Sequence, residues 1–419
     1  MAQLTEHAAV RRLYDRLGFG PREGDLDRGF DAVLDALPAP TAEDPPPPPV
    51  GAPRPTGDKR EANRQRAADE RALVVWWLDR MVTADAAATE RITWFWHGHF
   101  ATSEQKVRSP ALMLAQNRLF RRLGLGPFGP LAQAVVVDPA MLLWLDGDDN
   151  RAGSPNENLA REFLELFALG IGHYDEHDVR EAARALTGWK VVRGAGRAEP
   201  VAKRHDGGAK TILGDSRPHT AASLVDLVLS RPESADFVVG RLWFRMVSAA
   251  PPAPDAVERV VAAFRVDTRS ALRAIAAEPA FLDPANALVK QPVEWLVGLM
   301  RALGVRPAEF DEQVAGRLGR GLRALGQVPF RPPSVGGWPS GGAWLTTAAW
   351  PARLDLARLV ADRADLAGLG RADPVEGVRR RLGVDAWSER TRSALARVAD
   401  DPAELTTAAA CAPEYVVSG

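Results

Sequence analysis

Helical periodicity runs through almost the whole sequence and is the feature that most constrains its fold. The clearest case is segment 156–169, where Leu159, Phe163 and Leu166 fall on one side of a helix and charged residues fall on the other. The helical period disappears over 190–214, and a proline- and glycine-rich gap lies near 329–351. The pattern predicts a mainly α protein, a large multi-helical single domain, with less than about a tenth of its residues in strands.

The same pattern divides the chain into an N-terminal helical lead, a linker and a main domain. Residues 1–37 form the lead, with a helix expected from Thr5 to Leu17. Segment 38–58 holds five consecutive prolines, Pro45 to Pro49, and is predicted to be an extended linker or surface arm. Residues 59–419 are the main α-helical domain. Within it, 190–214 is a small irregular or β-hairpin insert, with short strands expected at 191–192 and 211–213.

Charge and cysteine content exclude several function classes. The chain has 53 Lys and Arg residues against 54 Asp and Glu residues, which argues against a general nucleic-acid binder. Its one cysteine, Cys411, excludes an internal disulfide framework and a thiolate-clustered metal site. The N-terminus has no apolar signal segment, and the longest uncharged stretch, 332–352, contains four prolines and four glycines. We therefore expect a soluble, cytoplasmic protein with no membrane segment.

His97 and His99 are the first candidates for chemistry. A helix ending before Gly98 would let the glycine turn His99 back beside His97, and two imidazoles two positions apart are a common metal-ligand pair. The alternative is that His97 interacts with the helix C-terminus and His99 caps a loop.

The polar face of the 156–169 helix is the second candidate. Its carboxylates could bind a divalent cation or act as acid and base, with Glu162 completing a metal site beside His97 and His99. The face consists of Glu157, Asn158, Arg161, Glu162 and Glu165. The alternative is a solvated surface on which Arg161 pairs with Glu157 or Glu165.

The third candidate is His205 and Asp206, with Lys210, in the non-helical insert. A His-Asp pair in a glycine-rich loop is suited to ligating a metal or to acid-base catalysis, while Asp206 followed by two glycines is also a typical turn. Lys210 is one of only six lysines among 53 basic residues, which indicates a need for a compact point charge. Three tryptophans in the proline- and glycine-rich gap, Trp338, Trp344 and Trp350, could form a stacking platform, but we interpret them as core residues.

Several strings make the chain similar to a known bacterial family. They include Trp94 to Ser103, Asp138 to Gly147, Pro155 to Phe167, Asp178 to Trp189, His205-Asp206, Val289 to Glu294 and Gly337 to Pro339. These strings, in this order, resemble the family known as domain of unknown function 1800, and the resemblance covers nearly the whole chain. It implies the fold and no particular chemistry. Many relatives are exported, and their genes often neighbour a sulfatase-like family, which implies a protein partner or a shared pathway.

Two functions remain as hypotheses. The first is an enzyme whose polar His/Glu/Asp pocket forms where the His97/His99 corner, the Glu157–Glu165 face and the His205-Asp206 insert converge. A divalent metal would suit such a pocket, for hydrolysis or for oxidation. The alternative is a non-catalytic interaction or maturation protein that acts with the product of a neighbouring gene.

Overall fold

A computed structural model describes residues 4–36, 46, 48, 50, 58–85, 87–370 and 372–418. Most of the predicted linker, 38–58, therefore lies outside the described residues. At its described points, Pro48 is buried and the Trp76 indole N–H donates to the Pro46 carbonyl at 2.9 Å.

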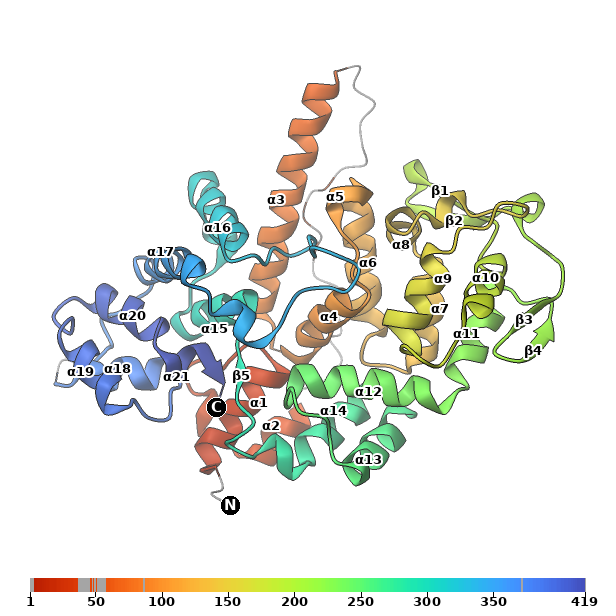
Figure 1. Ribbon diagram of the computed structural model, residues 1–419. Coiled ribbons are helices and arrows are strands. Elements are labelled where there is room, and N and C mark those ends of the chain that lie inside the picture. The colour runs from red at the N-terminus through yellow and green to blue at the C-terminus, as the bar shows by residue number, and fades with distance from the viewer. Residues whose placement is uncertain are drawn as a thin grey trace.

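Helices dominate the described chain, as the periodicity predicts (Figure 1). The α-helices of the first half are α1 (Glu6–Leu17), α2 (Phe30–Ala36), α3 (Lys59–Thr83), α4 (Ala87–His99), α5 (Glu104–Val107), α6 (Pro110–Leu123), α7 (Phe128–Val136), α8 (Pro139–Trp144), α9 (Asn158–Glu162) and α10 (Glu176–Ala185). Those of the second half are α11 (Ala221–Leu229), α12 (Pro232–Met246), α13 (Pro254–Phe264), α14 (Thr268–Ala277), α15 (Pro292–Leu303), α16 (Glu312–Ala324), α17 (Trp350–Ala361), α18 (Pro374–Arg381), α19 (Glu389–Ala396), α20 (Pro402–Ala410) and α21 (Pro413–Val416).

Local signals fix several helix ends. Thr5 caps α1 by accepting a hydrogen bond from the Ala8 N–H, and Gly18 follows its last residue. Asp175 and Asp178 form a reciprocal capping box at the start of α10. The helix expected from Thr5 to Leu17 is therefore confirmed, and each of these signals depends on neighbouring residues alone.

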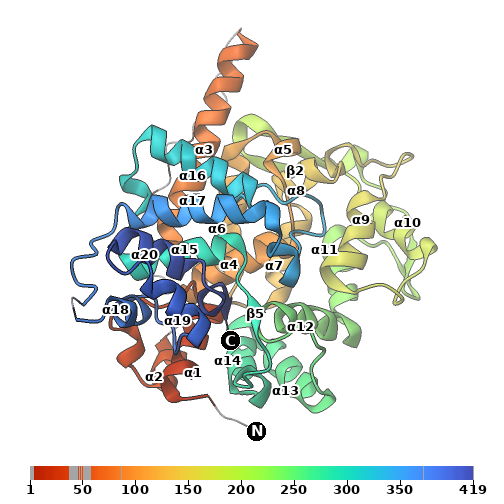
Figure 2. The same ribbon diagram turned by 60° about the vertical axis from the view of Figure 1, so that its left-hand side comes forward.

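Helix α4 lies at the centre of the molecule and packs against α1, α3 and α6 (Figures 1 and 2). Every residue of α4 except Gly98 is buried. A fully buried Glu90 near its start accepts two hydrogen bonds from Arg121, at 2.7 and 2.9 Å, and one from the Trp77 indole at 3.1 Å. Charged groups thus tie α4 to α6 and α3 inside the core.

Two local predictions are wrong. Helix α4 does not end before Gly98 but continues through His99. The segment 156–169 is not one regular helix, because α9 passes at Phe163 into a π-helix, η3 (Phe163–Ala168). The Leu169 and Gly170 N–H groups both donate to the Leu164 carbonyl, which closes the wider turn.

The insert forms two separate antiparallel hairpins and reaches beyond 214. Strand β1 (Trp189–Val192) pairs with β2 (Arg197–Pro200), and β3 (Lys210–Ile212) pairs with β4 (Asp215–Arg217). A third pair, β5 (Leu288–Val289) with β6 (Val417–Ser418), joins the C-terminal segment to the start of α15. These six strands of the described chain are two to four residues long, which confirms the prediction of little β-structure.

None of the helices in the described ranges has the length and apolar character that a membrane crossing needs. The longest, α3, carries many charged residues, and its N-terminal half projects beyond the body of the molecule in both views (Figures 1 and 2).

Candidate functional site

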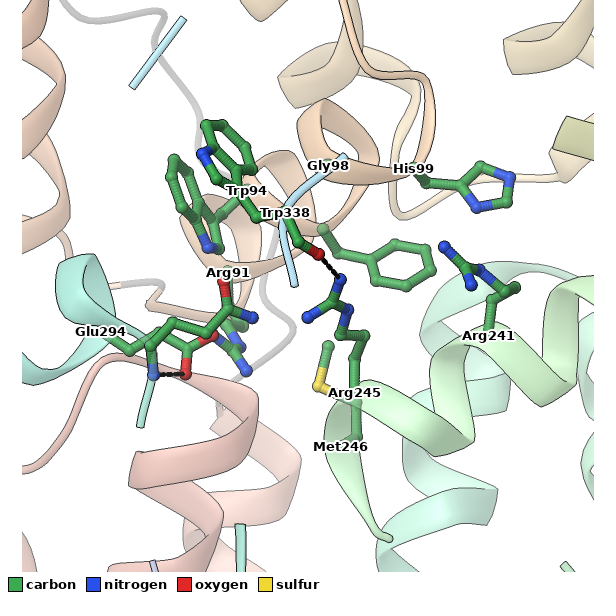
Figure 3. A pocket seen from close by; sticks show the side chains of 11 residues that line it. Arg91, Trp94, Gly98, His99, Arg241, Arg245, Met246, Glu294 and Trp338 are labelled. Atoms are coloured by element: carbon green, nitrogen blue, oxygen red, sulfur yellow. Dashed lines mark hydrogen bonds and ion pairs between the residues drawn. The ribbon is translucent and has the colours of Figure 1, made fainter. Parts of the chain in front are cut away.

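A polar cleft lies where α4, α12, the first turn of α15 and the loop carrying Trp338 meet (Figure 3). Its cavity is small, about 20 Å³, which is room for about one water molecule. The polar groups at its wall are Arg91, His99, Arg241, Arg245, Gln291 and Glu294. They come from positions about 200 residues apart, so only the tertiary fold assembles them.

Two arginines on one face of α12 give the cleft its charge. Arg241 and Arg245 are four positions apart and project from the same side of the helix. Arg245 donates to the Trp338 carbonyl at 2.8 Å and to the Pro339 carbonyl at 3.3 Å. Arg241 has no hydrogen bond or ion pair to any residue in the described ranges. Neither guanidinium is ion-paired with a carboxylate of the described chain.

The third arginine of the cleft is neutralised. Arg91 forms a buried ion pair with Glu294, which also accepts the Gln291 N–H at 3.1 Å in a capping box. This pair joins α4 to the start of α15 and lies at the end of the cleft opposite Arg241 (Figure 3). The cations of the cleft without an ion pair in the described chain are therefore Arg241 and Arg245. Arg241 also lines a second cavity together with Glu165, Glu233 and Asp236.

His99 faces the Arg241 guanidinium across the cleft (Figure 3). Its Nε2 lies 2.8 Å from the Phe167 carbonyl, which can only accept, so Nε2 carries the proton and donates. The ring is 4% exposed, and its Nδ1 is buried without a hydrogen-bond partner in the described chain. Burial, with Arg241 second, lowers the His99 pKa to about 3. The imidazole is therefore neutral near pH 7, and its buried Nδ1 is an acceptor within the cleft wall that no residue of the described chain uses.

Burial also acts on the two arginines. It lowers the pKa of Arg245 to about 10 and lowers the pKa of Arg241. Both side chains are part-buried, so each guanidinium has lost part of its hydration, and within the described chain only Arg245 regains hydrogen bonds, from the Trp338 and Pro339 carbonyls. An anion bound between these guanidinium groups would supply the missing charge.

Aromatic side chains form the remaining wall of the cleft. Trp338 stacks on Trp94 with ring centroids 4.9 Å apart and planes 21° apart. The preceding Gly337 has φ +79°, and a Cβ there would lie 2.3 Å from the Gly98 carbonyl oxygen. The loop backbone thus packs directly on α4, and this close approach holds Trp338 in place.

The sequence match to a known family extends across this whole structure. A family described as "Protein of unknown function (DUF1800)" matches residues 12–417. The chain belongs to the DUF1800 family. Comparison with curated proteins and with solved structures found no match. All residues of the cleft lie within the DUF1800 match.

The DUF1800 fold does not bring His97, His99 and Glu162 together as predicted metal ligands. Because α4 continues through Gly98, the two imidazoles lie about 160° apart around the helix axis, on nearly opposite sides. The His97 Nε2 accepts the Phe330 N–H at 3.0 Å. No group of three or more His, Cys, Asp or Glu residues in the described ranges is placed to hold a metal ion, so metal binding has no support here.

Side chains of the Glu157–Glu165 face form ion pairs and hydrogen bonds with neighbouring surface residues. Glu157 and Glu162 do not line the cleft. Arg161 lies 3.1 Å from Glu157 and 2.7 Å from Glu176, in line with the solvated-surface alternative. Glu165 accepts the Tyr174 hydroxyl at 2.8 Å and lines a more open cavity on the other side of Arg241. Burial, with the Glu165 charge second, raises the pKa of Glu162.

The insert residues form a separate hydrogen-bonded network. Arg184 donates to Asp206 at 2.8 Å and lowers the pKa of that carboxyl to about 2. The His205 Nδ1 lies 3.0 Å from the Thr187 carbonyl, and the buried Lys210 ammonium donates to the carbonyls of Asp206 and Gly208. A compact charge therefore organises the turn, as the rarity of lysine indicates. None of these groups lines the cleft.

Lys210→Met tests whether this network is structural. The change removes a buried ammonium from two carbonyls, so we expect the free energy of unfolding to fall by about 1–3 kcal/mol and the turn to become sensitive to protease. Any binding of phosphate or sulfate at the cleft, measured by calorimetry, should not change, because Lys210 does not line it. Lys203→Met, at an exposed position of the same insert, is the matched control. Lost binding with unchanged stability would instead assign Lys210 a direct role.

Sequence reasoning missed Arg91, Arg241, Arg245 and Glu294. A usable signal existed for two of them, because Arg241 and Arg245 are four positions apart in an otherwise largely apolar helix. The high arginine content of the chain hides it. Trp338 and Trp344 are buried, as interpreted from the sequence, whereas Trp350 is 44% exposed.

Proposed function

We propose that this protein is an enzyme that binds a small anionic substrate in the cleft between α4 and α12. The observation that supports the proposal is the pairing of an unpartnered guanidinium, Arg241, with an unpartnered ring nitrogen, His99 Nδ1, within the described chain. The Arg241 guanidinium can therefore donate to a ligand in the cleft, and His99 Nδ1 can accept from it.

Each group has a defined role in the proposal. Arg241 and Arg245 bind the anionic group, because guanidinium groups match planar and tetrahedral oxyanions through two parallel N–H donors. His99 Nδ1 accepts a hydrogen bond from the substrate, and the ring orientation is fixed by the Nε2–H bond to the Phe167 carbonyl. Trp94 and Trp338 cover the apolar part of the ligand. Of the residues predicted to form the polar pocket, His99 is part of this site, and arginines stand where carboxylates were predicted.

The non-catalytic alternative has an observation of its own. Trp350 and Leu354 are 44% and 38% exposed and lie four positions apart on α17. Exposed apolar side chains on one helix face suit a protein partner, such as the product of a neighbouring gene. A cleft that binds no anion would favour this alternative.

Calorimetric titration of the purified protein with phosphate, sulfate and acetate tests the enzyme proposal at its binding step. We expect Arg241→Met to weaken the binding of whichever anion the wild type takes up by about tenfold to a hundredfold, because a charged hydrogen bond contributes about 1.5–3 kcal/mol. Arg231→Met, at an exposed position just before the same helix, should leave binding unchanged. Equal binding by the Arg241 variant, or no binding by the wild type, would overturn the proposal.

A further inference from the structure

We infer that the anion selected by the cleft is a phosphate group that still carries a proton, and that His99 recognises its P–OH. The inference rests on the proposed function and narrows its substrate class. It follows from the numbers and directions of donors and acceptors around the cleft.

The His99 ring can only accept at the cleft. Its one N–H, on Nε2, is committed to the Phe167 carbonyl, and Nδ1 is buried with no donor from the described chain. A ligand that fills the cleft without offering a donor would leave Nδ1 buried and unsatisfied, so it should bind more weakly than one that offers a donor. A ligand that presents an N–H or O–H to this nitrogen is therefore favoured.

The arginines, in contrast to His99, need hydrogen-bond acceptors from the ligand. Arg241 donates to no residue of the described chain, and Arg245 retains donors beyond those bound to the Trp338 and Pro339 carbonyls. They require anionic oxygens. A hydrogen phosphate satisfies both sides, since it has deprotonated oxygens for the arginines and one hydroxyl for His99. Sulfate has four accepting oxygens and no proton, so one of them would face the Nδ1 lone pair.

The charges around His99 keep it in this accepting form. Arg241 and Arg245 face it from α12, and Arg91 lies on α4 with its charge cancelled by Glu294 of α15. From η3 the ring meets the Phe167 carbonyl, while Glu165 of that helix lies at the cavity beyond Arg241. Burial and Arg241 both oppose protonation, and the pKa of about 3 means that His99 stays neutral from about pH 5 to pH 8.

Comparison of phosphate with sulfate is the first test. Both are tetrahedral, and we expect phosphate to bind the wild type at least about tenfold more tightly near pH 7. His99→Phe keeps an aromatic ring among Phe95, Trp96 and Phe100 but removes the acceptor, so the preference should disappear. Equal or tighter sulfate binding by the wild type would overturn the inference and leave the proposed anion site standing. Absence of binding by either anion would overturn both.

The second test needs only the wild type and separates inorganic from organic phosphate. Methyl phosphate loses its remaining proton near about pH 6, whereas inorganic phosphate keeps one P–OH at about pH 8. We expect methyl phosphate affinity to fall from about pH 5 to pH 8 while inorganic phosphate affinity is maintained. Arginine recognition alone predicts the reverse for methyl phosphate, because its dianion is more highly charged. Methyl phosphate binding that strengthens with pH would therefore contradict the role of His99.

The relative affinities near pH 5 distinguish the two sources of phosphate. Binding of methyl phosphate as tight as that of inorganic phosphate would indicate a phosphate monoester ligand. Much weaker binding of methyl phosphate would indicate the free ion.

Discussion

Glu90→Ala is expected to lower the free energy of unfolding by about 3–5 kcal/mol, the cost of removing one partner from a buried ion pair. Glu90 is 0% exposed and accepts hydrogen bonds from Arg121, from Trp77 and, at 3.2 Å, from Arg80. Alanine removes the carboxylate from the Arg121 guanidinium and leaves a void beside the Trp77 indole. Chemical denaturation followed by circular dichroism measures the loss.

The pH dependence of the same variant checks the electrostatic origin of that loss. Burial alone would raise the pKa of Glu90, but Arg121 and Arg80 outweigh it and hold the pKa below its ordinary value of 4.5. The wild type should therefore lose this stabilisation as the pH falls through the lowered pKa, and the gap between wild type and variant should narrow in acid. Glu258→Ala, at an exposed position of α13, is the matched control. A loss of less than about 1 kcal/mol would contradict the assignment of Glu90 as a core anion.

Gly337→Ala is expected to displace the Trp338 loop and to abolish anion binding at the cleft. Alanine at φ +79° costs about 1–2 kcal/mol, and its Cβ would lie 2.3 Å from the Gly98 carbonyl oxygen. Because the Gly98 atoms that the Cβ would meet are all backbone and cannot rotate aside, the loop must move away from α4. Trp338 would then leave Trp94, and Arg245 would lose its two loop carbonyls.

Near-ultraviolet circular dichroism reports the Trp94–Trp338 stacking, and calorimetry reports the binding. Gly342→Ala is the control, since this glycine lies in the same segment, its φ is outside the left-handed region, and a Cβ added there would have no neighbouring atom within 4 Å. Unchanged spectra and unchanged anion binding in Gly337→Ala would show that the close approach of the loop to α4 does not shape the cleft.

The local features of this fold follow from neighbouring residues and could be predicted. Thr5 and Asp175 fix helix starts through bonds to N–H groups within three positions, and Gly170, at φ +90°, follows the π-helix that it ends. The apolar periodicity also predicts the buried side of segment 156–169, where Leu159 and Phe163 lie in the core. Such signals depend on the helix geometry alone, so they need no knowledge of the rest of the chain.

The π-helix and the continuation of α4 through Gly98 could not be predicted in this way. Both depend on what packs against the helix from a distance. The Phe167 carbonyl of η3 receives the His99 N–H, and Gly98 is covered by Gly337 and Trp338, more than 200 residues later. Local propensity is too weak to decide between a helix and a break where such contacts form.

The sequence by itself determined the helical class, the small insert and the polar residues worth testing. Only the tertiary structure decided which of them meet. It separated His205 and Asp206 into a turn held by Arg184 and Lys210, and it placed His99 opposite Arg241. The reason is physical. A histidine and an arginine form a binding site only when burial removes part of their hydration and no other residue bonds to their nitrogens. Both conditions depend on tertiary contacts, so the spacing of residues in the sequence does not predict them.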